Sequence, residues 1–222
     1  MSKPESVPGP TVRRLSLYLR QLEAFRDSNL QTVSSKQLGD ALRITDAQVR
    51  KDLAYFGQFG QAGIGYGVEE LIARVRGILG TDRPWNTMVL GAGNLGRALM
   101  SYRGFKKKGF DLIAVFDVDA TEIGQPVEPG SSMKVQPMAE MRQTVREREI
   151  KLAVLAVPAA AAQAVADDVI DAGVAGILNF APISLHVPPA ISLVSLDLAV
   201  HLEQLSFQIA AASAHNNHSN GA

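Results

Sequence analysis

A glycine-rich turn directly after an apolar run limits how the middle of this chain can fold. Met88-Val-Leu90 leads into Gly91, Ala92, Gly93, Asn94, Leu95 and Gly96, and a helix-compatible stretch follows over 97–102. In such a GxGxxG turn the first glycine permits a tight turn, the second lets the backbone approach a pyrophosphate and the third lets the helix pack on the strand. The N–H groups at the helix N-terminus then face the anion. We therefore expect residues 91–96 to bind a dinucleotide.

An acidic residue bears on which dinucleotide binds. Asp117 lies 21 residues after Gly96, at the end of the next predicted strand, where a carboxylate can accept hydrogen bonds from the adenosine ribose diol. The same charge would repel a 2′-phosphate, which favours NAD over NADP. Asp119 is a nearby competitor for this role, and the structural alternative for Asp117 is a solvated strand end.

Short apolar runs alternate with helical stretches from Trp85 onward. The predicted strands are 87–90, 112–116, 152–157, 176–180 and 191–195. Near-continuous apolar strands separated by helices are typical of a parallel sheet covered on both faces. Cofactors bind at the carboxyl ends of the strands in open α/β sheets. The residues at or directly after the ends of two of the predicted strands are therefore candidates for the nicotinamide end of the site, and the alternative is that they are ordinary loop residues. They are Val157, Pro158, Asn179, Phe180 and Ala181.

The first 80 residues have the outline of a helix-turn-helix followed by a hairpin. Residues 10–25 place apolar side chains at helical spacing. Ser34-Ser-Lys-Gln37 and Thr45-Asp-Ala-Gln48 each match the capping box, so two short helices with a tight turn between them are expected. Residues 57–67 hold five glycines interleaved with apolar residues, which suggests a small β-hairpin. This order predicts a winged-helix domain.

The second of these short helices carries residues that we expect to contact DNA. One face is apolar and would pack on the domain core, whereas the opposite face is small and presents Arg50 and Lys51. These cations are either an ordinary solvated face or contacts to phosphates and guanine edges, while Thr45 at the helix N-terminus could meet a phosphate. The DNA-binding candidates are Ser35, Thr45, Gln48, Arg50, Lys51, Tyr55, Phe59 and Gly63.

Composition narrows the function classes. Residues 1–80 hold 11 Lys and Arg against 8 Asp and Glu, whereas residues 81–222 hold 11 against 14, so a mildly basic module precedes a mildly acidic one. Cysteine is absent, which excludes disulfides and thiolate switches, so any redox sensitivity would come through a bound molecule. Without a signal peptide or a run of about 18 apolar residues, the expected compartment is the cytoplasm.

The chain offers few groups for hydride-transfer catalysis, which needs a general acid or base beside the nicotinamide. His215 and His218 fall in a tail at 213–222 that we predict to be disordered, His201 lies within the last helix and His186 lies in a loop. We therefore expect no catalytic residue and no metal site. The alternatives are an NAD-dependent oxidoreductase with a helical accessory domain and a CoA-binding module on the same type of sheet.

Several motifs, in this order, resemble the Rex family of redox-sensing repressors from about residue 10 to residue 212. They are Gln48-Val-Arg-Lys-Asp-Leu53, Tyr55-Phe-Gly57, Gly63-Ile-Gly-Tyr66, the glycine turn, Phe116-Asp-Val-Asp119 and Gly176-Ile-Leu-Asn-Phe-Ala-Pro182. The resemblance implies an α/β fold: a winged-helix DNA-binding domain at 1–80, a Rossmann NAD(H)-binding domain at 84–195 and a helix at 196–212 that is swapped onto the partner of a homodimer. It also implies that the dimer binds an inverted-repeat operator while NADH is scarce and releases it when NADH binds.

By the same resemblance, Arg20, Tyr102 and Asp197 match a polar network that couples the DNA-binding domain, the cofactor site and the swapped helix. Their plainer roles are a surface cation, a helix-end packing residue and an N-cap.

Two positions depart from the family pattern. Gln61-Ala62 stands in the wing where basic residues are common, which would weaken contacts to a narrow minor groove. Leu198 stands where a Phe is common against the nicotinamide, so discrimination between NADH and NAD⁺ would differ in strength.

Overall fold

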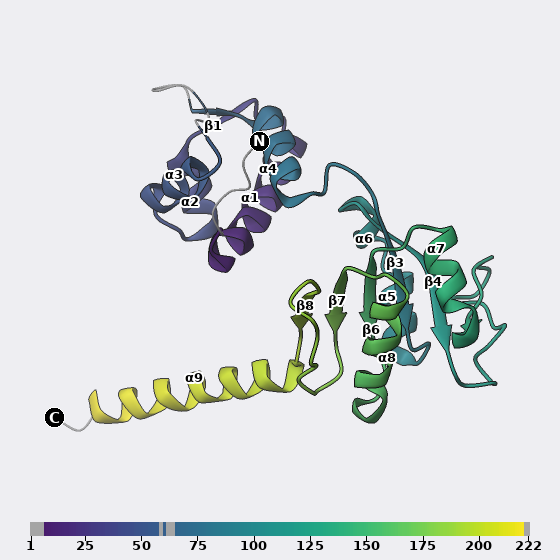
Figure 1. The fold of residues 1–222 in the computed structure, drawn as a ribbon. Helices are drawn as coiled ribbons and strands as arrows, with labels where there is room; N and C mark the ends of the chain where they lie inside the picture. Colours follow the sequence, from purple (N-terminus) through teal and green to yellow (C-terminus); the bar gives the residue numbers. More distant parts are fainter. Residues whose placement is uncertain (1–6, 58–59, 61–64, 220–222) are drawn as a thin grey trace. The chain divides into compact units, whose positions relative to one another are not determined.

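The computed structural model divides the chain into two compact units, Met1–Pro84 and Trp85–Ala222 (Figure 1). The structure describes residues 7–57, 60 and 65–219, and for 212–219 it describes the backbone alone. Each unit is described by itself below.

The first unit is a helix-turn-helix built on two longer helices. Its helices are α1 (Gly9–Asp27), α2 (Ser35–Leu42), α3 (Asp46–Ala54) and α4 (Val68–Leu79), and its strands are β1 (Thr32–Val33) and β2 (Tyr66–Gly67). The two strands pair antiparallel, with Val33 opposite Tyr66. The predicted hairpin over 57–67 therefore ends in a strand that pairs with the segment before α2. Residues 58–59 and 61–64 of that hairpin lie outside the described part of the chain.

The turn between α2 and α3 depends on two residues with unusual backbone requirements. Arg43 ends α2 in the left-handed region, at φ 56°. A side chain on Gly39 would place its Cβ 2.5 Å from the carbonyl oxygen of Ile44, so only glycine lets the turn pass this close to α2. The turn fixes the angle at which α3 leaves α2, and α3 is the helix that carries the predicted DNA contacts.

The two predicted capping boxes differ in the structure. At the start of α2, the Ser34 hydroxyl accepts from the N–H of Gln37, and the Gln37 side chain accepts from the N–H of Ser34, which completes the box. At the start of α3, Thr45 accepts from the N–H of Gln48, but the Gln48 side chain does not return to Thr45. Its amide turns instead to Asp52, so the second box is a simple N-cap.

The second unit contains a parallel sheet with strand order β5-β4-β3-β6-β7-β8. The strands are β3 (Trp85–Leu90), β4 (Phe110–Asp117), β5 (Gln136–Pro137), β6 (Leu152–Leu155), β7 (Gly176–Asn179) and β8 (Ser192–Ser195). Each predicted strand is present with ends shifted by a few residues, and the short edge strand β5 is additional. The predicted fold class, a helix-turn-helix unit followed by a parallel α/β sheet, is confirmed.

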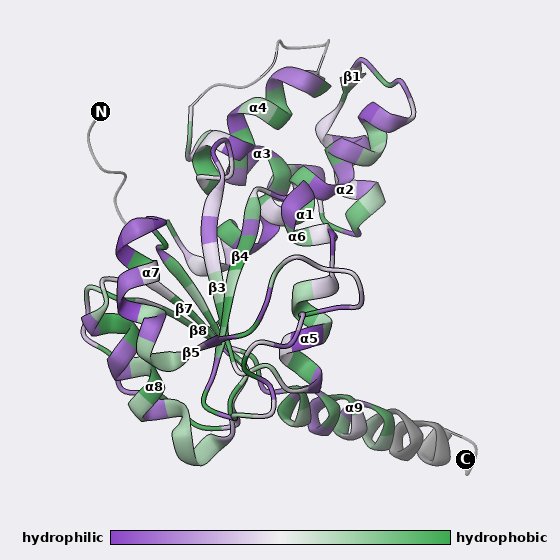
Figure 2. Cartoon of the chain, turned by 90° about the vertical axis from the view of Figure 1, so that its right-hand side faces the viewer, coloured by the Kyte–Doolittle hydropathy of each residue, from purple (hydrophilic) through white to green (hydrophobic). Residues whose placement is uncertain are grey.

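Helices lie on both sides of this sheet. They are α5 (Asn94–Ser101), α6 (Gly104–Lys107), the 3-10 turn η1 (Met138–Glu140), α7 (Met141–Glu147) and α8 (Ala159–Asp171). Figure 2 shows α7 and α8 on one side and α5 on the other. Met141, Ala162 and Val169 pack with one face of the sheet, and Leu99 packs with the opposite face, around Val89 and Val154.

Helices cover both faces as predicted, but an open groove remains on the α5 face. An apolar groove of about 370 Å³ runs over β3, β4, β6, β7 and β8, bordered by Leu99 and Phe105. Its floor includes Leu112, Val154 and Leu178, and Val194 beside them is 57% exposed. An open apolar surface at the centre of a sheet indicates that another element is needed to cover it.

Helix α9 (Leu198–Ser219) follows β8 and is drawn in yellow in Figure 1. Side chains 198–211 are all exposed. The prediction of a disordered tail from residue 213 is wrong as far as Ser219, because helix α9 continues to that residue. Once a helix has formed, extending it through an alanine-rich segment such as 210–214 requires no new nucleation and favours further turns.

Candidate functional site

The glycine turn has the geometry that its sequence predicts. Gly91 has φ 97°, and a Cβ there would lie 2.5 Å from the carbonyl oxygen of Ala156, so the turn passes close to the end of β6. A Cβ on Gly96 would collide with the carbonyl of Gly91, which shows how closely α5 packs on the turn. Gly93 is exposed, and a Cβ there would have nothing within 4 Å. The turn is therefore closed on the protein side and open at Gly93.

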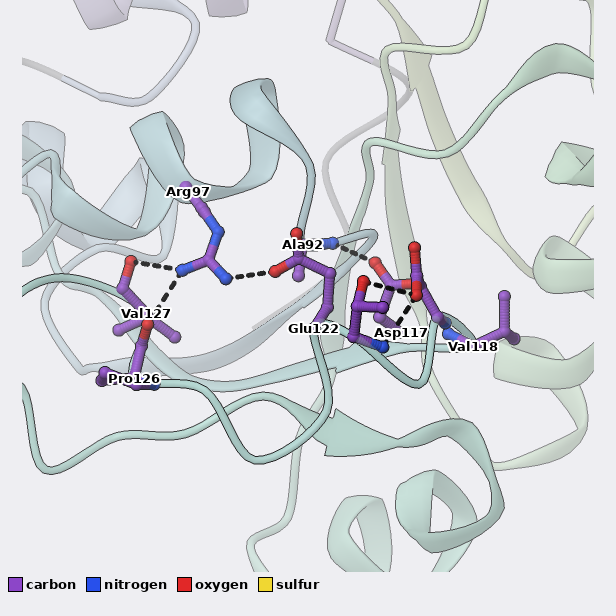
Figure 3. A network of polar contacts seen from close by, with 9 residues as sticks. Ala92, Arg97, Asp117, Val118, Glu122, Pro126 and Val127 are labelled. Carbon is purple, nitrogen blue, oxygen red and sulfur yellow. Dashed lines mark hydrogen bonds and ion pairs between the residues drawn. The ribbon is translucent and has the colours of Figure 1, made fainter.

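Asp117 is bonded to this turn (Figure 3). Its Oδ2 accepts from the N–H of Ala92 at 2.6 Å, and its Oδ1 accepts from the N–H groups of Val118 and Asp119 at 2.7 and 2.9 Å. The competing carboxylate of Asp119 is exposed and accepts from the hydroxyl and N–H of Thr121. Hydrogen bonds from Thr121 lower the pKa of Asp119. Of the two candidates, Asp117 is therefore the one in contact with the glycine turn.

Arg97, the residue after the third glycine, holds the segment that follows β4. Its guanidinium pairs with Glu122 and donates to the carbonyl oxygens of Pro126 and Val127 at 2.8 and 3.2 Å (Figure 3). These bonds tie residues 122–127 to α5 beside the turn. From the sequence, Arg97 is expected only to lie in a helical stretch. Cations near the start of a helix are common, so its position alone gave no sign of these contacts.

The register of the sheet brings the other cofactor candidates to the same edge. Leu90 lies opposite both Phe116 and Leu155, and Leu155 lies opposite Asn179, so β3, β4, β6 and β7 end together. Val157 and Phe180 are half-buried just beyond these ends, Pro158 is exposed and Ala181 is buried. The structure thus gathers the predicted cofactor residues along one edge of the second unit.

Asn179 differs from its neighbours because it is fully buried and its amide is engaged by the chain itself. Its Nδ2 donates to the carbonyls of Ala181 and Ile183 at 3.1 Å and lies 3.4 Å from the Ser195 hydroxyl, while its Oδ1 accepts from the N–H of Ala181. These bonds fix the loop after β7. The side chain of Asn179 is therefore used to hold this loop, and its predicted cofactor role stays a prediction.

The predicted DNA-contacting residues of the helix-turn-helix form a small polar cluster. The Arg50 guanidinium lies 2.6 Å from the Asp46 carboxylate and donates to the Ser35 hydroxyl at 3.1 Å. Its hydrogen bond lowers the pKa of Asp46. Lys51 is exposed and Tyr55 is half exposed. Two further candidates, Phe59 and Gly63, lie outside the described residues, as does the divergent pair Gln61-Ala62.

Beneath this surface, a buried cluster centres on Asp52, which is 1% exposed. Its carboxylate accepts from Arg14 Nε and Nη2 at 2.5 and 2.7 Å, from the Tyr18 hydroxyl at 2.7 Å and from Gln48 Nε2 at 2.8 Å. Burial alone would raise the pKa of Asp52, but these hydrogen bonds outweigh burial and lower it. The sequence analysis quoted Asp52 in a motif without a role and assigned Gln48 to DNA alone.

The three residues predicted to couple the domains belong to different units. Arg20 is exposed on α1 of the first unit, whereas Tyr102 and Asp197 lie in the second. Tyr102 is 61% exposed and its ring meets Phe105 edge-on, with 5.0 Å between centroids. Asp197 accepts from the N–H of Ala199 at 2.9 Å, as an N-cap of α9 does. Their coupling role stays a prediction.

Among the described residues, no three or more His, Asp or Glu side chains are grouped to hold a metal ion. The helices in the described part of the chain also include none with the length and apolar character needed to cross a membrane.

Comparisons with known proteins match both units. A family model described as "Putative DNA-binding protein N-terminus" matches residues 6–54, and one described as "CoA binding domain" matches residues 82–183. The redox-sensing transcriptional repressor Rex of Carboxydothermus hydrogenoformans is 47% identical over 203 residues, covering 91% of this chain and 96% of its own.

Solved structures of a Rex-family repressor, RSP, are also similar. The complex of RSP with β-NAD⁺ and operator DNA has a TM-score of 0.89 at 33% identity and covers 98% of this chain and 99% of that one. The complex of RSP with β-NADH has a TM-score of 0.84 at 32% identity and covers 96% and 99%.

Proposed function

This chain belongs to the Rex family of redox-sensing transcriptional repressors, and on that premise we propose that NADH controls its binding to an operator. The first unit would bind an inverted-repeat DNA site when NADH is scarce, and the second unit would bind NADH and release the DNA. The proposal rests on one observation. The Asp117 carboxylate accepts a hydrogen bond from the glycine turn, at the edge of the sheet where β3, β4, β6 and β7 end.

The cofactor would lie along that edge. The turn at 91–96 supplies backbone N–H groups and open space at Gly93 for a pyrophosphate. Asp117 would hold the adenosine ribose and disfavour a 2′-phosphate. Val157, Pro158, Phe180 and Ala181 would form the nicotinamide end, with Asn179 fixing their loop. NADH supplies no chemistry in this proposal, since it acts as a signal and no residue is assigned a catalytic role.

The operator would meet the exposed surface of α3. Arg50 and Lys51 provide charge for phosphates or guanine edges, and Ser35, Thr45, Gln48 and Tyr55 surround them. Because Arg50 already contacts Asp46 and Ser35, its guanidinium is oriented by the protein. An inverted-repeat site needs two such helices related by two-fold symmetry, which requires a dimer.

The second unit offers the parts of that dimer. Leu198, Leu202, Leu205 and Ile209 form one stripe of α9, and Val200 and Phe207 lie on a different side of the helix. A helix that is apolar on several sides is normally buried. We propose that α9 of one protomer covers the apolar groove of its partner and is itself covered between the two protomers.

Sensing requires that NADH and NAD⁺ bind differently, although they differ only by a hydride and one positive charge. Regulation can be no larger than that difference in affinity, and a coupling of about 2 kcal/mol would weaken operator binding roughly 30-fold. Arg20, Tyr102 and Asp197 are the residues that we propose to transmit it, with Leu198 tuning the preference for NADH.

The test is fluorescence anisotropy of a labelled inverted-repeat operator at fixed salt, because phosphate contacts make DNA affinity strongly salt-dependent. We expect the protein to bind the operator, NADH to release it, and NAD⁺ at the same concentration to leave it bound. Equal operator affinity with and without saturating NADH would contradict the proposal.

A second candidate ligand is CoA, which the match of residues 82–183 to the CoA binding domain model favours. CoA and NADH both carry an adenosine and a pyrophosphate, so both could use the glycine turn. Because Asp117 is proposed to accept from both hydroxyls of the ribose diol, its charge would also oppose the 3′-phosphate of CoA. Competition settles the choice: displacement of bound NADH by equimolar CoA would favour CoA.

The proposed compartment is the cytoplasm, where a repressor would meet both NADH and DNA.

A further inference from the structure

We propose that Asp52 is a positioning residue for DNA recognition: it fixes helix α3 on helix α1 and orients the amide of Gln48 so that this amide can read an adenine. The proposal rests on operator binding by the first unit. Asp52 is buried and would not touch DNA, so its effect would pass through Gln48 and through the rotation of α3.

The carboxylate links α3 to α1 and also holds a side chain of its own helix. Arg14 and Tyr18 lie one turn apart on α1, and Gln48 and Asp52 lie one turn apart on α3. An ionised carboxylate has about four acceptor positions, and the two Arg14 contacts, Tyr18 and Gln48 account for four, with the Thr11 hydroxyl a longer fifth contact at 3.5 Å. The contacts with Arg14 and Tyr18 cross to α1 and therefore require a particular rotation of α3 about its axis, whereas the Gln48 contact lies within α3.

That rotation determines where the neighbouring cations point. Lys51 is exposed and precedes the buried Asp52 directly, and Arg50 is exposed one residue earlier. Successive residues of a helix are rotated by about 100° from one another. Anchoring Asp52 therefore holds Lys51 and Arg50 in defined directions on the outer surface. A buried ion pair is weak evidence for added stability, and specifying one geometry is the best-attested use of such a pair.

The same carboxylate decides which way the Gln48 amide faces. Because an ionised carboxylate only accepts hydrogen bonds, the nitrogen of the amide must point to Asp52. The Oε1 atom and the second N–H are then left for the half-exposed side of Gln48. An amide that offers one acceptor and one donor together matches the N6 and N7 edge of adenine in the major groove. Fixing it beforehand reduces the entropy lost on binding.

The experiment measures the operator affinity of the full-length protein against a set of operators, each with one base pair changed symmetrically in both half-sites. We expect the wild type to discriminate about 30-fold or more at one A·T pair per half-site, because the symmetric change removes two good base contacts. Gln48→Ala should reduce that ratio to near one. Asp52→Asn should reduce it at least threefold at the same base pair, while NADH binds as in the wild type.

Two control variants separate positioning from general damage. Asp40→Asn changes an exposed acid on α2 and should keep the discrimination at that base pair, even if overall affinity changes. Leu22→Ala removes a buried apolar side chain of the same core that makes no hydrogen bond to Asp52, so any loss of affinity should be equal for all operators.

Three outcomes would overturn the proposal. In one, Asp52→Asn weakens binding equally at every base pair, as Leu22→Ala does. In another, Gln48→Ala leaves every ratio unchanged. If the wild type binds no operator at all, the proposed function fails as well, which distinguishes that case from the first two.

A measurement on the wild type covers the case in which Asp52→Asn fails to fold. The side-chain amide protons of Gln48 can be identified in NMR spectra by their loss in Gln48→Ala. We expect one of the two protons to be shifted downfield and to exchange slowly with solvent. Two protons at the positions and exchange rates of a free amide would overturn the proposal.

Discussion

The carboxylate of Asp117 accepts a hydrogen bond of 2.6 Å from the backbone N–H of Ala92. This bond joins the end of β4 to the turn that follows β3. The protein itself therefore sets the distance between the carboxylate proposed to hold the ribose and the backbone proposed to hold the pyrophosphate. Substitutions at this contact should alter which dinucleotide binds before they alter the fold.

Replacing Asp117 by alanine should weaken NADH binding by about tenfold or more, because hydrogen bonds to a charged group typically contribute 1.5–3 kcal/mol. The variant should also lose most of its preference for NADH over NADPH. Titrations that follow the fluorescence of the reduced nicotinamide measure both effects. Asp119→Ala is the matched control and should change neither value; the opposite pattern would assign the ribose to Asp119.

Replacing Arg97 by alanine should release residues 122–127 from α5, because three contacts of its guanidinium are lost at once. Amide hydrogen exchange in this segment should become about tenfold faster, and NADH binding should weaken several-fold. Lys106→Ala, a change of an exposed cation on α6, serves as the control. Unchanged exchange at 122–127 would show that the segment is held by other contacts.

Acid should destabilise the first unit through Asp52. Because hydrogen bonds lower its pKa in the folded state, its contribution to stability is present above the unfolded value of about 3.9 and is lost as the pH falls through the lower folded value. NMR signals of Leu15 and Leu22 can follow the unfolding of this unit between pH 2 and 5. Asp52→Asn should flatten the dependence of stability on pH in this range. Asp46→Asn should remove only a small part of that dependence, since Asp46 is a surface ion-pair partner.

Alkali should act on the same cluster through Tyr18. Burial, together with the hydrogen bond to Asp52, raises its pKa. Its contribution is therefore complete below the unfolded value of about 10 and is lost as the pH rises further. Tyr18→Phe should abolish this arm of the pH profile. An equally steep loss above pH 10 in that variant would place its origin elsewhere.

Placing a charge on α9 should separate the protomers of the proposed dimer. Leu202 is 67% exposed and lies on the main apolar stripe, so Leu202→Asp should shift the protein from dimer to monomer in light scattering. Operator affinity should fall with it, because two linked recognition helices bind far better than one. Gln208→Asp adds the same charge at a polar position of the helix and should leave the dimer intact. A dimeric Leu202→Asp would exclude α9 as the contact.

The parts that the sequence predicted well depend on local patterns. Strands β3 and β6 are buried over most of their length and therefore read as continuous apolar runs, and the glycine turn is a local motif in which Gly91 and Gly96 each meet a steric demand. The complete capping box at Ser34 is likewise local. Such features need no knowledge of which distant segments meet.

The parts that were missed depend on contacts between distant residues. Arg14 and Asp52 are 38 residues apart, and an aspartate in a helix ordinarily reads as solvent-facing. The Gln48 side chain had two possible partners, Thr45 and Asp52, and only the packing of α3 on α1 decides for Asp52. Arg97 reaches Glu122 across 25 residues in the same way. Helix α9 was cut short because its last turns have no apolar pattern to mark them.

The contrast among the three glycines of the turn bears on how this protein could lose its regulation by mutation. Side chains at Gly91 or Gly96 collide with backbone, so such alleles would be lost as misfolded protein. Gly93 alone accepts a methyl group without any clash, and that group would occupy the space proposed for the pyrophosphate. A genetic selection for strains that keep their operators silenced during reductive stress should therefore recover substitutions at codon 93 and none at codons 91 and 96.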